Sequence, residues 1–165
     1  MPPPETCARH VIGIGGLEVR CGPGEIATYA LGSCLGITIH DPTSGIGGML
    51  HAQLPCAARN PERFRETPGL FVDSGLELLF ARAVALGANR RRLRVAVAGA
   101  ASMSAVANDV FNIPQQNLTA LRKAFWAMGV MVGAQDTGGN EPRTLFLDLA
   151  SGATTVLMCG QRKNL

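Results

Sequence analysis

Two strand-like runs joined by a short turn limit the fold of this chain more than any other feature of the sequence. Residues 35–40 are rich in apolar and β-branched side chains, and residues 46–54 form a second run that ends near His51. Between them lies the five-residue segment Asp41-Pro-Thr-Ser-Gly45. Runs joined by three to five residues that include glycine are typical of a β-hairpin. The hairpin predicts that His51 returns to the start of the first strand, beside Cys34.

Cys34 follows Gly32-Ser33 in what reads as a tight turn, and this placement leaves two interpretations open. A thiol with an ordinary pKa of about 8.5 becomes a strong nucleophile when a base or cation favours the thiolate. Cysteine is also among the most buried residue types, so Cys34 and His51 could be structural.

The rest of the chain mixes strand and helix signals. Apolar residues recur at helical spacing from Leu76 to Leu86, with Asp73 or Ser74 as the cap and Gly87 as the stop. A second helix is predicted after Asn117. Residues 56–68 are polar and predict an exposed loop. Further strands are predicted at 26–31, 93–98, 130–135, 143–149 and 154–158. Many strands with two helices indicate an α/β or α+β domain.

Length and composition indicate one soluble domain over residues 1–165, with residues 1–8 flexible. Apolar residues make up 47% and charged residues 16% of the chain. A net charge of +3 without a long basic run, and a single Trp and Tyr, argue against nucleic-acid binding. No signal peptide and no apolar run of about 18 residues is found, which favours a cytoplasmic protein without membrane insertion. Five cysteines without a CxxC pair fit reduced thiols, and neither a metal nor a cofactor is expected.

Several motifs occur in a fixed order along the chain: Leu31-Gly-Ser-Cys34, His40-Asp-Pro42, Gly45-Ile-Gly-Gly-Met-Leu-His-Ala-Gln-Leu-Pro55, Phe71-Val-Asp73, Leu86-Gly-Ala-Asn-Arg90, Asn117, and Asp136-Thr-Gly-Gly-Asn140 with Arg143-Thr144. Together they resemble the CheD family of bacterial chemoreceptor glutamine deamidases. The similarity extends from about Ile12 to Val156. The pairing of Gly-Ser-Cys with Gly-Gly-Met-Leu-His at this spacing is its most specific part.

The resemblance implies a fold, a reaction and partners. It implies a layered sandwich of two β-sheets with two helices packed on one face, and a catalytic set of Cys34, His51 and Thr28. In that set Thr28, six residues before Cys34, could orient the imidazole through its hydroxyl or its carbonyl; the alternative is an ordinary strand threonine. The implied substrate is a glutamine in the cytoplasmic domain of a methyl-accepting chemotaxis receptor. The family also implies a CheC-type phosphatase as a possible partner. A non-catalytic or dual-use adaptor that binds such a phosphatase is therefore the alternative, and a hydrolase of small amides is a third reading.

A deamidation at Cys34 also predicts a substrate-binding surface. The backbone N–H groups of Ser33 and Cys34 are candidates for stabilising an oxyanion, with Gly32 allowing close approach of the substrate. Phe71 and Asp73 are candidates for the border of the groove. The sequence departs from the family pattern at Ala30, where glycine is usual, and at Ala100-Ala-Ser102, which replaces a more Gly-rich turn; it also lacks a customary arginine near Gln115-Gln116.

Overall fold

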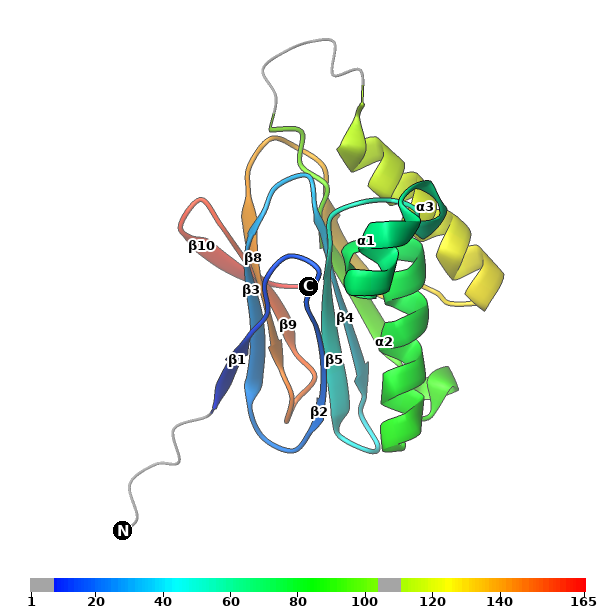
Figure 1. The fold of residues 1–165 in the computed structure, drawn as a ribbon. Helices are drawn as coiled ribbons and strands as arrows, with labels where there is room; N and C mark the ends of the chain where they lie inside the picture. Colours follow the sequence, from blue (N-terminus) through cyan, green and yellow to red (C-terminus); the bar gives the residue numbers. More distant parts are fainter. Residues whose placement is uncertain (1–7, 104–110) are drawn as a thin grey trace.

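The computed structural model describes residues 8–103 and 111–165, which form two stacked β-sheets with helices on the outer face of one sheet (Figure 1). The strands are β1 (Arg9–Val11), β2 (Leu17–Cys21), β3 (Glu25–Leu31), β4 (Leu35–Asp41), β5 (Ile46–Ala52), β6 (Arg94–Gly99), β7 (Ala134–Thr137), β8 (Arg143–Asp148), β9 (Thr154–Met158) and β10 (Gln161–Asn164). The helices are α1 (Pro61–Glu66), α2 (Val72–Leu86) and α3 (Ile113–Met128), with 3-10 turns η1 (Ala57–Arg59), η2 (Pro68–Leu70) and η3 (Arg90–Arg92). The predicted sandwich with helices on one face is confirmed.

Each sheet has five strands. The first has the order β1-β3-β8-β9-β10 and the second the order β2-β5-β4-β6-β7. The predicted hairpin is the antiparallel pair β4–β5, in which Gly36 lies opposite His51 and Leu35 opposite Ala52. His51 therefore does return to the start of β4, as the turn at residues 41–45 predicted.

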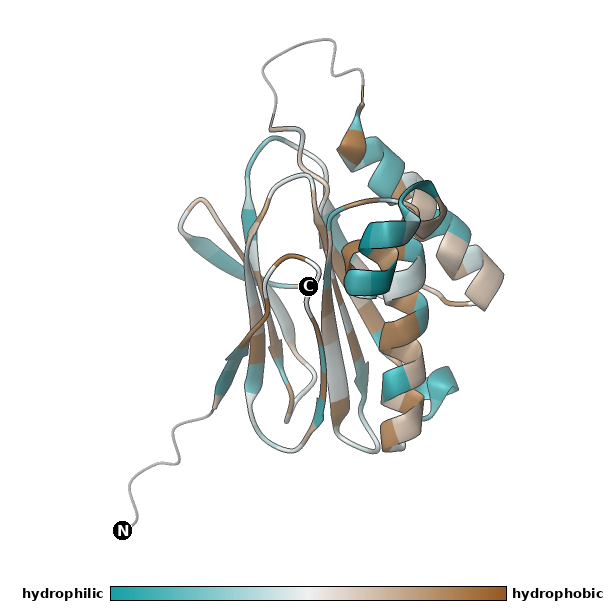
Figure 2. Ribbon diagram, in the orientation of Figure 1, coloured by the Kyte–Doolittle hydropathy of each residue, from teal (hydrophilic) through white to brown (hydrophobic). Residues whose placement is uncertain are grey.

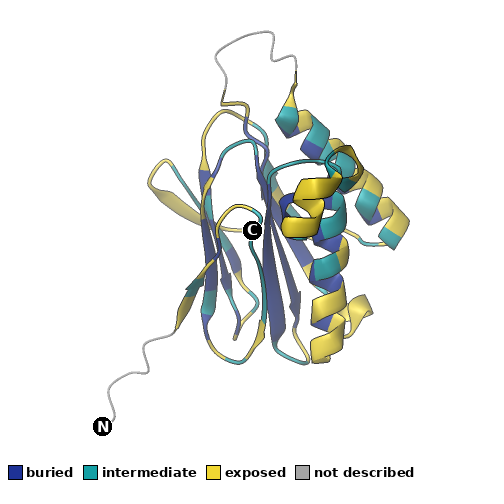
Figure 3. Ribbon diagram, viewed as in Figure 1, coloured by how far each residue is buried: buried dark blue, intermediate teal, exposed yellow. Residues whose placement is uncertain are grey.

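The apolar residues form two layers. One layer lies between the sheets and includes Ile26, Met49 and Leu145. The other joins the second sheet to α2 and α3 and includes Leu50 and Leu76. Strand β5 contributes to both layers, and every residue of β4 and β5 is buried (Figure 3). Brown apolar segments of α2 and α3 alternate with teal polar ones, as expected of helices that cover a sheet on one side (Figure 2).

Three elements differ from the sequence-based expectations. The predicted loop at 56–68 contains α1 and two 3-10 turns, because Asn60 and Pro61 provide an N-cap and a first helical residue. Helix α3 begins at Ile113 rather than after Asn117, with Pro114 in its first turn. A strand expected at 130–135 is found as β7, from Ala134 to Thr137. Gly87 ends α2, as predicted, and both Gly87 and Gly129 adopt the left-handed conformation at the ends of their helices.

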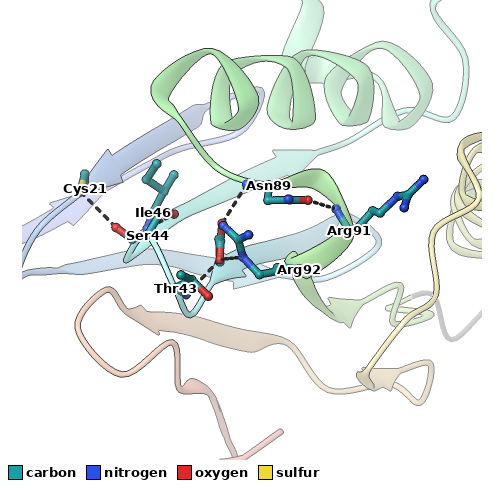
Figure 4. A network of polar contacts seen from close by, with 8 residues as sticks. Cys21, Thr43, Ser44, Ile46, Asn89, Arg91 and Arg92 are labelled. Atoms are coloured by element: carbon teal, nitrogen blue, oxygen red, sulfur yellow. Dashed lines mark hydrogen bonds and ion pairs between the residues drawn. The ribbon is translucent and has the colours of Figure 1, made fainter.

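The far end of the β4–β5 hairpin is fixed by a buried carboxylate. Asp41 accepts hydrogen bonds from the Arg92 guanidinium at 2.8 and 3.0 Å, from the Asn89 amide at 2.8 Å and from the Thr43 amide at 3.0 Å (Figure 4). The Asp41 side chain is fully buried. Its pKa is held well below the usual range, chiefly by the Arg92 hydrogen bonds. This network anchors the β4–β5 turn to the segment that follows α2.

Candidate active site

The His51 imidazole lies between the two sheets, where it meets Thr28 of β3. His51 Nδ1 is 2.7 Å from Thr28 Oγ1, and Oγ1 is 2.9 Å from the Ile12 carbonyl oxygen. A hydroxyl has one hydrogen, and a carbonyl can only accept, so the Thr28 hydroxyl donates to Ile12. His51 Nδ1 must then donate its N–H to Thr28, which leaves the lone pair on Nε2. This settles that the contact uses the Thr28 hydroxyl rather than its carbonyl.

The main chain at His51 is held on both sides. Its amide donates to the Gly16 carbonyl at 3.0 Å, and its carbonyl accepts from the Gly15 amide at 2.8 Å. On the other side, β4 pairs with it through Gly36. His51 is 1% exposed, and its Nε2 has no hydrogen-bond partner among residues 8–103 and 111–165. The structure therefore presents a rigidly held imidazole with one basic nitrogen unused.

Cys34 is on the same sheet face as the imidazole. It packs in the layer between the sheets with Met49, which is two residues before His51 and so points the same way. Cys34 precedes Gly36, the partner of His51, by two residues, which makes thiol and imidazole diagonal neighbours on adjacent strands. The thiol lies just beneath the surface, with the residue 6% exposed.

Burial keeps both groups uncharged. It raises the pKa of the Cys34 thiol, an effect that the residue's own backbone N–H partly offsets, and it lowers the pKa of His51 to about 4. One interpretation of the sequence was a thiolate stabilised by a neighbouring base. In the structure, desolvation penalises both ions, so the thiol and the imidazole are both neutral at pH 7.

The turn before β4 uses all of its carbonyls and leaves two amides free. The carbonyls of Gly32 and Cys34 accept from the amides of Ala101 and Ala100, both at 2.8 Å. The Ser33 carbonyl accepts from the Asn117 side chain at 3.0 Å. In contrast, the amide N–H groups of Ser33 and Cys34 have no partner within the described part of the chain. Unpaired amides beside a thiol are the arrangement that stabilises an oxyanion.

The backbone around this turn is strained at two alanines. Ala30 and Ala100 have φ of 56° and 50°, the left-handed region that favours glycine. These are the positions where the sequence departs from a glycine-rich pattern. Gly99 is a stricter case, since a Cβ there would lie 2.2 Å from the Cys34 carbonyl oxygen. Gly32 has room for a side chain only if Met103 moves, because its Cβ would lie 3.1 Å from Met103 Cγ.

Asn117 is a site residue that the sequence did not identify as one. It is fully buried on α3, and its Nδ2 group donates to the Ser33 carbonyl and to the Gln53 carbonyl, both at 3.0 Å. The prediction that the helix begins after Asn117 hid this contact. An asparagine inside the first turns of a helix, where it has low propensity, is the signal that would have found it.

The two residues expected at the border of the groove lie in different surroundings. Phe71 is 1% exposed and belongs to the core. The Asp73 carboxylate accepts the Ala57 amide at 3.0 Å and lines a cavity of about 570 Å³ between η1, α2 and α3. Neither Cys34 nor His51 lines that cavity. It therefore lies beside the candidate active site and is not the place of its chemistry.

Within the described ranges, 8–103 and 111–165, no three His, Cys, Asp or Glu side chains gather in a way that could hold a metal ion. Over the same part of the chain, no helix is both long and apolar enough to cross a membrane.

Sequence comparison relates this chain to known proteins. Residues 53–158 match the family model described as CheD chemotactic sensory transduction. A protein of Solibacter usitatus named "Probable chemoreceptor glutamine deamidase CheD" is 41% identical, over 94% of this chain and 92% of its own. Similar proteins occur in Pyrococcus abyssi (41% identical, 86% of each chain) and Anaeromyxobacter dehalogenans (42%, 88% of this chain and 91% of the relative). The first of these alignments is long enough to include residues 28–51. On this evidence the chain belongs to the CheD family.

Proposed function

We propose that this protein is a cysteine-dependent deamidase that converts glutamine side chains of a chemotaxis receptor to glutamate, with Cys34 as nucleophile, His51 as general base and acid, and Thr28 as the residue that orients His51. The observation that carries the proposal is the hydrogen-bond chain Ile12–Thr28–His51, which leaves the basic His51 Nε2 unpaired on the face that bears Cys34. The relatives' names supply the substrate class.

The first half of the reaction forms a thioester. His51 Nε2 takes the thiol proton as Cys34 Sγ bonds to the side-chain carbonyl carbon of the glutamine. The resulting imidazolium keeps its Nδ1–H on Thr28 Oγ1. The oxyanion is stabilised by the amide N–H groups of Ser33 and Cys34. When the C–N bond breaks, Nε2 returns its proton to the leaving nitrogen and ammonia departs.

Water completes the reaction. His51 Nε2 removes a proton from water as the oxygen attacks the thioester carbonyl, and the same amides stabilise the second oxyanion. Cleavage of the C–S bond gives the glutamate side chain, and the proton on Nε2 restores the Cys34 thiol. One glutamine and one water thus yield one glutamate and one ammonia, and the enzyme ends in its starting state.

The neutral resting state sets the order of proton transfer. Because the Cys34 pKa is raised and a His51 pKa of about 4 leaves the imidazole unprotonated at neutral pH, the proton must pass from Sγ to Nε2 as the bond to carbon forms. Because the family resemblance implies a glutamine in the cytoplasmic domain of the receptor, we propose that the protein acts in the cytoplasm. A non-catalytic adaptor that binds a CheC-type phosphatase is the alternative, and an unused basic nitrogen beside a thiol favours catalysis over it.

Substitution of Cys34 tests the proposal directly. Cys34→Ala should reduce ammonia release from receptor glutamine by about 10⁶-fold, since loss of a covalent nucleophile has that order of effect. Mass spectrometry of receptor cytoplasmic peptides, with the gain of about 1 Da at each converted glutamine, measures it. Cys56→Ala, at a partly buried cysteine that the proposed reaction does not use, is the matched control and should retain activity. Near wild-type deamidation by a folded Cys34→Ala protein would exclude the cysteine mechanism and leave the adaptor.

A further inference from the structure

We infer that Asn117 is a positioning residue that holds the Ser33–Cys34 peptide so that the Cys34 N–H faces the reacting carbonyl; the inference rests on the proposed function. Asn117 Nδ2 donates a hydrogen bond to the Ser33 carbonyl oxygen at 3.0 Å. That carbonyl and the Cys34 N–H belong to one peptide unit. None of the described peptide bonds is cis, and in a trans peptide the C=O and N–H point in opposite directions.

Fixing the carbonyl therefore fixes the amide. With the Ser33 oxygen drawn toward α3, the Cys34 N–H points to the opposite side, away from the helix. That N–H has no partner within the described residues, and it lies close enough to its own sulfur to affect the thiol's pKa. The amide is thus placed beside the nucleophile and left free for an oxyanion.

Asn117 has a firm support on its other side. The second Nδ2 hydrogen goes to the Gln53 carbonyl, also at 3.0 Å. The amides of Gln53 and Leu54 both donate to the Leu70 carbonyl, at 2.9 and 3.0 Å. Asn117 therefore joins the turn before Cys34 to a segment that is already anchored, just beyond the last β4–β5 pair of Leu35 and Ala52.

The assignment of the Asn117 amide follows from chemistry. Both partners are carbonyls and can only accept, so the nitrogen must face them. The Oδ1 atom is then buried and has no hydrogen-bond partner among residues 8–103 and 111–165. A buried acceptor without a partner costs stability. A residue kept for packing alone would avoid that cost, whereas two donors on one short side chain are what the positioning role needs.

Other contacts hold the thiol and imidazole without Asn117. The Cys34 carbonyl is bound by the Ala100 amide, and His51 is bound by Gly15, Gly16 and Thr28. Loss of Asn117 should therefore loosen the oxyanion donor more than it disturbs the thiol–imidazole pair. This asymmetry makes the proposal testable apart from stability.

The test compares two reactions of Cys34 in Asn117→Ala. Acylation by p-nitrophenyl acetate passes through an oxyanion, whereas alkylation by iodoacetamide does not, and peptide mass spectrometry reads both at Cys34. Neither reaction needs a receptor, so failure of the proposed substrate would leave this test intact. We expect the acylation rate to fall at least tenfold and the alkylation rate to change less than threefold. Gln115→Ala, an exposed amide on the same helix, should change neither rate.

Equal falls in both rates, or no fall in either, would overturn the inference. If Asn117→Ala does not fold, Asn117→Ser is the second variant. Because serine retains one donor, the acylation rate should again fall more than the alkylation rate, but by a smaller factor than in Asn117→Ala. In deamidation assays, the folded variant should lose kcat with little change in KM, because the bond acts on the transition state rather than on receptor binding.

Discussion

The two ends of the β4–β5 hairpin bury polar side chains in opposite ways. At the turn, the Asp41 carboxylate is charged and accepts four hydrogen bonds from three residues. At the other end, Cys34 and His51 are uncharged, and His51 Nε2 is unpaired within the described residues. In Figure 1 the β4–β5 turn lies at the lower end of the sandwich and the β3–β4 connection at the upper end.

The difference distinguishes buried polar groups that stabilise the fold from buried polar groups that are available for chemistry. A buried polar atom with all its partners stabilises the native state, while one without a partner is stable only because its surroundings are rigid. Here the same two strands supply that rigidity to both ends. The paired end fixes the register of the hairpin, and that register places His51 beside Cys34. Three experiments can break or sharpen this comparison.

Substitution at the unpaired end should have the largest effect on activity. His51→Ala removes the proton carrier of every step, so kcat for deamidation should fall by about 10²–10⁴-fold or more. The rate of Cys34 alkylation at pH 7 should fall as well, because the thiol of raised pKa loses its base. Asp41→Asn is the contrasting variant: at a temperature where it is folded, its kcat should match wild type. An equal loss of activity in both variants would mean that the two ends are not functionally distinct.

Acid should weaken the two ends in different pH ranges. His51 has a pKa of about 4 when folded and about 6.5 when unfolded, so the unfolded chain binds more protons between these values. The free energy of unfolding should therefore fall as the pH drops from 6.5 to 4, by about 3 kcal/mol from this residue. Asp41 has a lowered pKa, so its contribution is present above its unfolded pKa of about 4 and is lost below it.

Urea unfolding from pH 7 to pH 3 measures both ranges. His51→Gln should flatten the dependence between pH 6.5 and 4, and Asp41→Asn should flatten it below pH 4. The slope of the free energy of unfolding against pH for the wild type, minus that for the variant, gives the contribution of the substituted residue apart from the other histidines and carboxylates. Wild-type and His51→Gln proteins with the same slope between pH 6.5 and 4 would show that His51 is not buried as a neutral base.

The orientation of His51 should give the smallest of the three effects. Thr28→Val keeps the shape of the side chain but removes the hydroxyl, which leaves His51 Nδ1 and the Ile12 carbonyl without their shared partner. We expect kcat to fall about tenfold to a hundredfold, a loss of about 1.4–2.7 kcal/mol. Thr28→Ser restores the hydroxyl and should recover most of the rate. Wild-type kcat in Thr28→Val would mean that the backbone contacts at Gly15 and Gly16 are sufficient to orient the ring.

The sequence predicted those parts of the site that depend on local order. The hairpin around residues 41–45 predicted the return of His51 to Cys34, because turn length fixes register. The link between His51 and Thr28 is different, since it crosses from one sheet to the other. No periodicity encodes how two sheets stack, so the family resemblance, not spacing, pointed to Thr28. The free amides of Ser33 and Cys34 were anticipated from the turn itself.

What the sequence missed came from contacts between distant segments. Asn117 meets Ser33 across 84 positions and Gln53 across 64. The Ile12 carbonyl reaches Thr28 across 16. The capping signals at Asn60 and Pro61 were present, but the polar composition of residues 56–68 favoured a loop. Phe71 was expected at a surface groove because of its motif, yet its apolar ring is better accommodated in the core.

The outermost strands of the helix-free sheet bear on how copies of this protein meet one another. That sheet ends in β1 and β10, which are three and four residues long. All residues of β10 are exposed, and its sequence Gln-Arg-Lys-Asn places two positive charges on the open edge. Short, charged edge strands oppose the pairing of one sheet with the next. Copies of this protein should therefore not polymerise by sheet-to-sheet pairing.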